Sequence, residues 1–178
     1  MIMLDEYGFE IYEENQFPLA YLITFRTYGT WLHGDERCSV DRHGKNIYGT
    51  LDLAPNRNLN EAMKVNLKQP EIILNDLQRT TVESAIRELC EQRNYHLQAI
   101  NVRSNHLHAV VSAQMKSERI ADAFKAFATK KLRSENLIAK ELQIWSRGKS
   151  RQYLWKPHHV NLAIKYVLFG QDDSPFKI

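Results

Sequence analysis

The run from Asn105 to Val111 places two histidines two residues apart in an apolar, β-branched stretch. This composition is typical of a β-strand, in which successive side chains point to opposite faces. His106 and His108 therefore share one face, while Leu107 turns toward a core on the other. Neutral imidazole is a common metal ligand, so the pair can supply two ligands from one stiff strand. Alternatively, both are polar residues on the solvent face of a half-buried strand, because a metal site needs a further ligand.

Hydrophobic periodicity along the chain predicts an order of strand, helix, strand, strand, helix, strand and helix. This order fits an α+β sandwich in which helices cover one face of an antiparallel sheet. We expect strands over residues 19–27, 95–102, 105–111 and 153–155, and helices over 75–93, 117–134 and from Pro157 to Gly170.

Two of the predicted helices have start signals. Asn75 or Asp76 can cap the first, and Ser117 can cap the second. In the first helix Cys90 lies on the apolar stripe, so we expect a core residue rather than a reactive thiol. Cys38 and Cys90 form no CxxC motif, and neither a disulfide framework nor a zinc site is indicated.

The last helix carries a tyrosine away from its main apolar stripe. At about 100° per residue, Tyr166 falls nearer to Leu162 and Phe169 than to that stripe. A tyrosine placed only for packing would join the stripe, so Tyr166 is a candidate functional residue or an interface residue. The predicted stripe consists of Val160, Ala163, Ile164, Val167 and Leu168.

The chain of 178 residues fits a single domain, 1–178. Residues 1–18 form an acidic arm, and residues 28–58 form a loop insertion that holds four of the seven glycines together with Trp31. The histidines of this loop are candidate ligands, although isolated loop histidines are usually solvated. With neither a secretory signal nor an apolar run of membrane-spanning length, we expect a cytoplasmic protein without membrane association.

Charge is distributed unevenly along the chain. Residues 1–92 carry a net charge of −6 and residues 93–178 one of +9. This split favours a polyanion-binding face built from the second half, although exposed cations can also merely solvate a helix. Near residue 150, basic residues alternate with Trp145, Tyr153 and Trp155, a pattern that suits single-stranded nucleic acid, unless these rings close the core. The candidate DNA-binding residues are Lys125, Lys130, Lys131, Arg147, Lys149 and Arg151.

These features together resemble a known family. An Asn precedes His-Leu-His mid-chain, Trp145-Ser-Arg-Gly follows, and Lys165-Tyr166-Val167 with Gln171 comes late. Near the start lies Tyr21-Leu-Ile-Thr-Phe-Arg-Thr-Tyr-Gly-Thr-Trp-Leu-His-Gly. The chain resembles, over about residues 19 to 171, insertion-sequence transposases of the single-tyrosine HUH type and their domesticated, repeat-associated relatives.

The resemblance implies a ferredoxin-like antiparallel sheet and a metal-dependent endonuclease and strand transferase acting on single-stranded, hairpin-containing DNA ends. Tyr166 would be the nucleophile that forms a 5′-phosphotyrosine link. His106, His108 and Gln171 would hold Mg²⁺ or Mn²⁺. In the family the glutamine follows the tyrosine by about one turn, whereas Gln171 stands at i+5, so the helix must bulge or unwind at Gly170. A back-up ligand is His159.

The resemblance also implies an assembly. We expect a homodimer in which the tyrosine helix of one subunit serves the histidine pair of the other. Two alternatives to the transposase stay open. One is a non-catalytic or domesticated protein that binds hairpin nucleic acid, and the other is unrelated metal chemistry at the two histidines.

Overall fold

A computed structural model of the chain describes residues 3–4, 10–11, 17–32, 35 and 54–170. Most of the predicted arm, most of the 28–58 loop, Cys38 and Gln171 lie outside these residues. The strands are β1 (Met3–Leu4), β2 (Glu10–Ile11), β3 (Ala20–Thr27), β4 (His96–Val102), β5 (His106–Ser112) and β6 (Trp145–Leu154). The helices are α1 (Arg57–Val65), α2 (Asp76–Gln92), α3 (Ser117–Ser134) and α4 (Pro157–Phe169).

The main sheet has the strand order β4-β5-β3-β6, with every neighbouring pair antiparallel. Apart from α1, the chain from β3 to β6 runs strand, helix, strand, strand, helix, strand, which is the ferredoxin-like connection. The predicted α+β class and antiparallel ferredoxin-like sheet are therefore confirmed. The two short strands β1 and β2 form a separate two-stranded antiparallel sheet.

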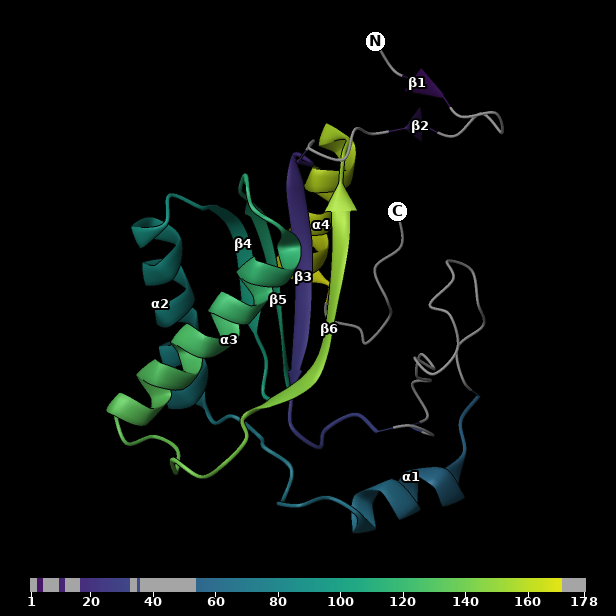
Figure 1. Cartoon of the computed structure of the whole chain (residues 1–178), viewed down its shortest axis with the longest axis vertical. Helices are drawn as coiled ribbons and strands as arrows, with labels where there is room; N and C mark the ends of the chain where they lie inside the picture. The colour runs from purple at the N-terminus through teal and green to yellow at the C-terminus, as the bar shows by residue number, and fades with distance from the viewer. Residues whose placement is uncertain (1–2, 5–9, 12–16, 33–34, 36–53, 171–178) are drawn as a thin grey trace.

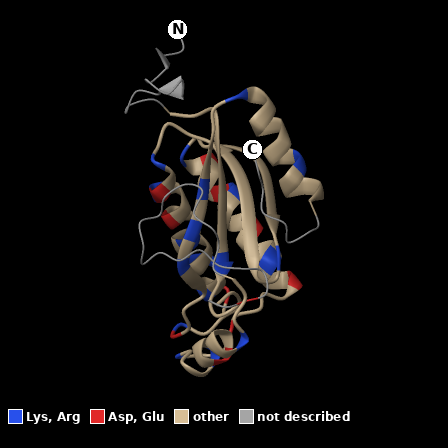
Figure 2. Cartoon of the chain, turned by 90° about the vertical axis from the view of Figure 1, so that its right-hand side faces the viewer, with Lys and Arg blue, Asp and Glu red and all other residues tan. Residues whose placement is uncertain are grey.

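Helices cover both faces of this sheet (Figure 1 and Figure 2). α2 and α3 pack on one face, where Tyr21, Ile23 and Phe25 of β3 join the larger core. α4 packs on the other face, against a smaller core that includes Leu22 and Val110. The expectation of helices on one face thus holds for α2 and α3 and fails for α4, because both alternating sets of strand residues contain apolar side chains that need cover.

The helix ends show which start signals operate. Of the two predicted caps, Asn75 and Asp76, the structure uses Asn75, which forms a capping box with Gln78 at the start of α2. Ser117 does not cap α3 but is its first residue, and its hydroxyl lies 3.1 Å from that of Tyr153. Cys90 is buried as expected, and burial raises the pKa of its thiol to about 11.

Two further elements differ from the prediction. α1 was not predicted, since the expected loop ends at 58 and no element was assigned to 59–65; it lies away from the sheet and none of its residues is buried (Figure 1). β6 begins at Trp145 rather than near Tyr153. Its polar residues before Tyr153 also pair with β3, and β6 forms the edge of the sheet. None of the described helices is both long enough and apolar enough to cross a membrane.

Candidate active site

The histidine pair lies on an inner strand of the sheet. β5 runs between β4 and β3, and Leu107 points into the larger core. His106 and His108 therefore point to the opposite face, the one that α4 covers. Their ring centroids are 4.8 Å apart and the rings are nearly perpendicular. The predicted shared face of the pair is confirmed.

Hydrogen bonds hold both rings through the same nitrogen. Nδ1 of His106 lies 2.7 Å from Oδ1 of Asn105, which can only accept, so this Nδ1 carries the hydrogen. Nδ1 of His108 lies 2.7 Å from the hydroxyl of Thr24, which can accept in the same way. In this tautomer Nε2 of His106 keeps its lone pair, and Nε2 of His108 keeps its own when the Thr24 hydroxyl accepts from Nδ1. Such partners are the usual means of orienting histidines that ligate a metal.

His108 is neutral at ordinary pH. Burial lowers its pKa to about 3, and the positive charges of His106, Arg26 and Arg103 contribute in the same direction. A neutral imidazole can donate its lone pair without first losing a proton. His108 is thus prepared chemically for metal binding.

Tyr166 comes to the pair from α4. Val160, Ala163 and Val167 bury one side of this helix against the sheet, and Tyr166 is half-buried beside them. Its ring centroid lies 5.2 Å from that of His108 in the same chain. The predicted stripe is wrong at Leu168, which is 44% exposed. Tyr166 and the pair lie side by side within the one chain described, and the expected exchange of helices between subunits stays a prediction.

The C-terminal end of α4 is fixed from two sides. The side-chain amide of Asn101 on β4 donates to the carbonyl of Val167 at 3.0 Å. The N–H of Gly170 donates to the carbonyl of Tyr166 at 2.8 Å, and Gly170 itself adopts an extended conformation. The helix therefore ends at Phe169, as the expected role of Gln171 requires, while Gln171 lies outside the described residues.

The two imidazoles are suitable ligands for a divalent ion. Within the described ranges, however, no three His, Cys, Asp or Glu residues lie close enough together to hold a metal ion. His159 does not join the pair and instead contacts His158 in the first turn of α4, with ring centroids 4.1 Å apart. The described ligands are thus His106 and His108 alone.

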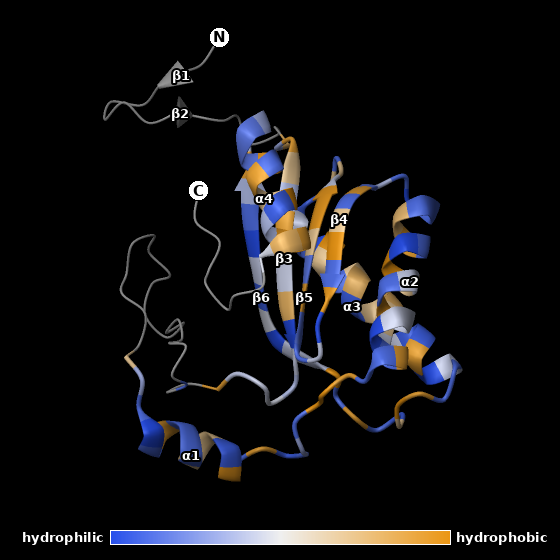
Figure 3. Cartoon of the chain, turned by 180° about the vertical axis from the view of Figure 1, so that it is seen from behind, coloured by the Kyte–Doolittle hydropathy of each residue, from blue (hydrophilic) through white to orange (hydrophobic). Residues whose placement is uncertain are grey.

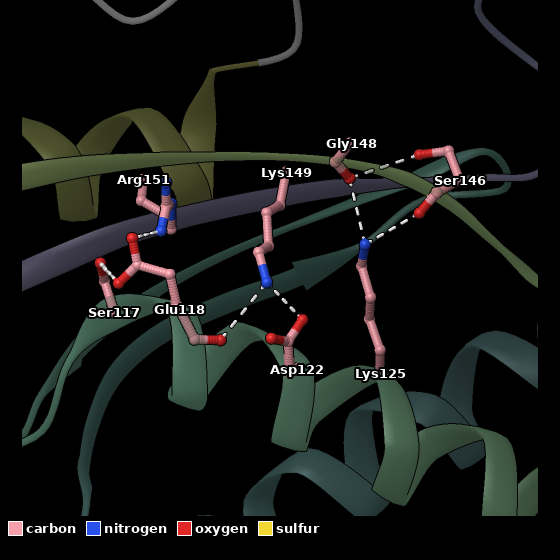
Figure 4. A network of polar contacts seen from close by, with 8 residues as sticks. All are labelled: Ser117, Glu118, Asp122, Lys125, Ser146, Gly148, Lys149 and Arg151. Carbon is pink, nitrogen blue, oxygen red and sulfur yellow. Dashed lines mark hydrogen bonds and ion pairs between the residues drawn. The ribbon is translucent and has the colours of Figure 1, made fainter.

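Most of the predicted DNA-binding residues lie on the other side of the sheet and contact other parts of the chain. Lys149 pairs with Asp122 and Arg151 with Glu118, both on α3 (Figure 4). Lys125 donates to the carbonyls of Ser146 and Gly148. The DNA-binding role of the set stays a prediction. Lys131 lies near Glu88 and Glu135, Lys130 lines a hollow on α3, and Arg147 is exposed on β6.

The aromatic residues near position 150 divide between two roles. Trp145 is buried against Phe25 and donates its indole N–H to Lys125 and Thr129, so it closes the core. Tyr153 is 43% exposed and stacks with Trp155. Tyr153 lies opposite Tyr21, a residue of the larger core, and is therefore on the sheet face away from the histidines.

Sequence reasoning assigned no role to four residues around the pair: Thr24, Asn101, Asn105 and Arg26. The alternation of β3 placed Thr24 and Arg26 on one face, which was a usable signal. It did not show that β3 would pair with β5, because the strand order depends on contacts between distant segments.

Comparisons with known proteins complete the description. The model of a family described as "Transposase IS200 like" matches residues 65–166, more than half of the chain. A solved REP-associated tyrosine transposase bound to a REP hairpin shows 12% identity and a TM-score of 0.49, covering 89% of this chain and 69% of that one. A Deinococcus radiodurans R1 protein provisionally assigned as a transposase shows 13% identity and a TM-score of 0.48, covering 89% and 95%. No curated protein matches.

Proposed function

This chain belongs to the IS200-like transposase family, and on that premise we propose that it cleaves and rejoins single-stranded DNA through Tyr166. The observation that carries the proposal is the contact between Tyr166 and His108, whose ring centroids lie 5.2 Å apart on one face of the sheet. A phenol beside two imidazoles that could hold a metal ion supports nucleophilic attack on a phosphodiester, because metal coordination is one way to activate the nucleophile.

The residues that would hold the divalent ion are His106 and His108 through Nε2, with Gln171 proposed as the third ligand. Imidazole ligands favour Mn²⁺ over Mg²⁺. When bound, such an ion polarises the phosphate and screens its developing charge.

The reaction is a transesterification. The phenolic oxygen of Tyr166 loses its proton and bonds to phosphorus, while the bond from phosphorus to the 3′ oxygen breaks and that oxygen gains a proton. The products are a 5′-phosphotyrosine and a free 3′-hydroxyl. Because one phosphoester replaces another, a 3′-hydroxyl can reverse the step and join strands without ATP. We propose hairpin-containing DNA ends as the substrate.

The test is covalent trapping. The protein is mixed with Mn²⁺ and a single-stranded hairpin oligonucleotide labelled at either its 3′ or its 5′ end, and then run on a denaturing gel. The 3′ label should migrate with the protein and the 5′ label should not, because the protein keeps the downstream fragment. Tyr166→Phe should form no adduct, whereas Tyr153→Phe, which removes a hydroxyl from the other face of the sheet, should form it normally.

Variants of the pair separate cleavage from binding. His106→Ala and His108→Ala should abolish the adduct and largely preserve hairpin binding, because phosphate contacts with Lys and Arg dominate affinity. An adduct that persists in Tyr166→Phe contradicts the assigned nucleophile. Hairpin binding without any adduct in the unmodified protein would support the non-catalytic alternative.

A further inference from the structure

A basic side chain begins directly beside the histidine pair. In the register of β3 with β5, Arg26 lies opposite His106. Thr24, two residues earlier on the same face, contacts His108 at 2.7 Å. Directly opposed residues of antiparallel strands have Cβ atoms roughly 5 Å apart. Arg26 therefore projects on the active-site face, next to the first histidine.

The turn after β3 brings an aromatic ring onto this side chain. The hydroxyl of Thr30 donates to the carbonyl of Thr27, whose own N–H donates to the carbonyl of Asn105. The turn is thus joined to the residue that precedes His106. The indole of Trp31 lies against the guanidinium of Arg26 in a cation–π contact. Stacking occupies the face of a guanidinium, whereas all five of its N–H groups point outward in its plane.

The positive charge of Arg26 is unfavourable for a metal ion at the histidine pair when no DNA is bound. A cation held by His106 and His108 would lie near Arg26, whose charge already acts on His108. Two neighbouring positive groups repel each other unless an anion lies between them. The scissile phosphate is the anion that a strand-cleaving enzyme brings to this place.

We propose that Arg26 is a further catalytic residue, which donates hydrogen bonds to a non-bridging oxygen of the scissile phosphodiester, and that Trp31 is the positioning residue for its guanidinium. The inference rests on the proposed function. As the bond from Tyr166 to phosphorus forms and the 3′ oxygen departs, negative charge builds up around phosphorus. Charge-assisted N–H donors directed at that charge stabilise it.

The test compares single-turnover cleavage at saturating Mn²⁺ among three variants. Arg26→Gln should slow cleavage about 100-fold. Arg26→Lys should fall between this variant and the unmodified protein, because an ammonium keeps the charge and loses the planar fork. The matched control is Arg119→Gln, which removes the same charge from an exposed position on α3 and should stay within about twofold.

A second readout separates phosphate contact from damage to the metal site. Mn²⁺ affinity is measured without DNA by titration. Arg26→Gln should bind Mn²⁺ as tightly as the unmodified protein or more tightly, because a neighbouring positive charge has gone. Trp31→Ala should slow cleavage, while Trp31→Phe should keep most of the cleavage rate. In a protein that already carries Arg26→Gln, Trp31→Ala should slow cleavage no further.

Two outcomes would overturn the inference. One is Arg26→Gln cleaving at the rate of the Arg119→Gln control. The other is a slower cleavage rate in Arg26→Gln that returns to normal when more Mn²⁺ is added. That result would show that Arg26 acts on metal binding. Both differ from failure of the proposed function, in which the unmodified protein itself forms no adduct at Tyr166.

Discussion

Asn101 of β4 donates its side-chain amide to the carbonyl of Val167, the residue that follows Tyr166 in α4, at 3.0 Å. Val167 is in the last turn of the helix, where carbonyls lack partners within the helix. This hydrogen bond and the small apolar side of α4 determine how the helix is turned toward the sheet. The hydrogen bond joins the residue after Tyr166, the proposed nucleophile, to an edge strand that carries neither histidine of the pair.

Asn101→Ala should therefore slow adduct formation about tenfold, while the free energy of unfolding falls by about 1 kcal/mol, the usual net value of one hydrogen bond. Mn²⁺ affinity should not change, because the histidines keep their partners. Single-turnover cleavage and urea unfolding provide the two measurements. Gln98→Ala is the control, since this β4 amide contacts Ser112 and not α4. Equal cleavage rates in the two variants would refute the positioning role.

Thr24→Val should weaken Mn²⁺ binding about 10- to 100-fold, as loss of a ligand's hydrogen-bond partner does in other metal sites. The variant keeps the shape of the side chain and removes the group that holds Nδ1 of His108. Thr24→Ser keeps the hydroxyl and should bind Mn²⁺ nearly normally. The Mn²⁺ affinity of both variants is measured by titration. Similar affinities of Thr24→Val and Thr24→Ser would show that Thr24 does not orient the ring of His108.

Gly170→Ala should reduce adduct formation through a steric effect. A Cβ at this position falls 3.0 Å from Cδ2 of the Tyr166 ring and against the carbonyl oxygen of the same residue. Either the ring or the end of the helix must move. Phe169→Ala is the neighbouring control, because Phe169 is 73% exposed. Trapping on denaturing gels should show a clear loss in the first variant only, and full activity in Gly170→Ala would contradict the expected clash.

The stability of the metal-free protein should depend on pH through His108. The pKa of this imidazole is about 3 in the folded chain and about 6.5 in an unfolded one. Between these values the unfolded state binds more protons, so the free energy of unfolding rises with pH, by at most about 1.4 kcal/mol per pH unit from this group. His108→Gln should flatten that slope. Urea unfolding from about pH 4.5 to 7.5 measures it, and parallel profiles would exclude the effect.

Mixing two inactive variants tests the arrangement of subunits. His106→Ala lacks a complete pair and Tyr166→Phe lacks the nucleophile. We still propose a homodimer. If the contact of His108 with Tyr166 within one chain forms the working site, a mixture of the two variants stays inactive. Subunit exchange must be verified with differently tagged chains. Recovery of adduct in the exchanged mixture would show that α4 serves its partner instead.

Strand alternation made much of the site predictable. The spacing of His106 and His108 determines their common face because strand side chains alternate strictly. This inference succeeds because it depends on neighbours within one element. The pattern of α4 placed Tyr166 off the stripe that packs on the sheet, whereas in the structure Tyr166 packs against the smaller core and contacts His108, and Leu168 is exposed.

Inferences that depend on which elements meet were less accurate. Lys149 and Arg151 read as a basic surface in sequence, yet the pairing of β6 with β3 sets them against Asp122 and Glu118 of α3. The face that α4 covers was also not predictable, since Leu22 and Ile23 are both apolar and each needs cover. Figure 3 shows α4 lying across the sheet on the side away from α2 and α3.

The placement of α4 has a consequence for newly made chains. All four strands of the main sheet precede residue 157, so a ribosome that has released the chain up to that point has delivered both histidines and Arg26 but no Tyr166. Such a chain holds every strand of the sheet and lacks the proposed nucleophile. On the proposed function, the capacity to cut would therefore arise only in a late event, when α4 docks on the face of the sheet that carries the histidine pair.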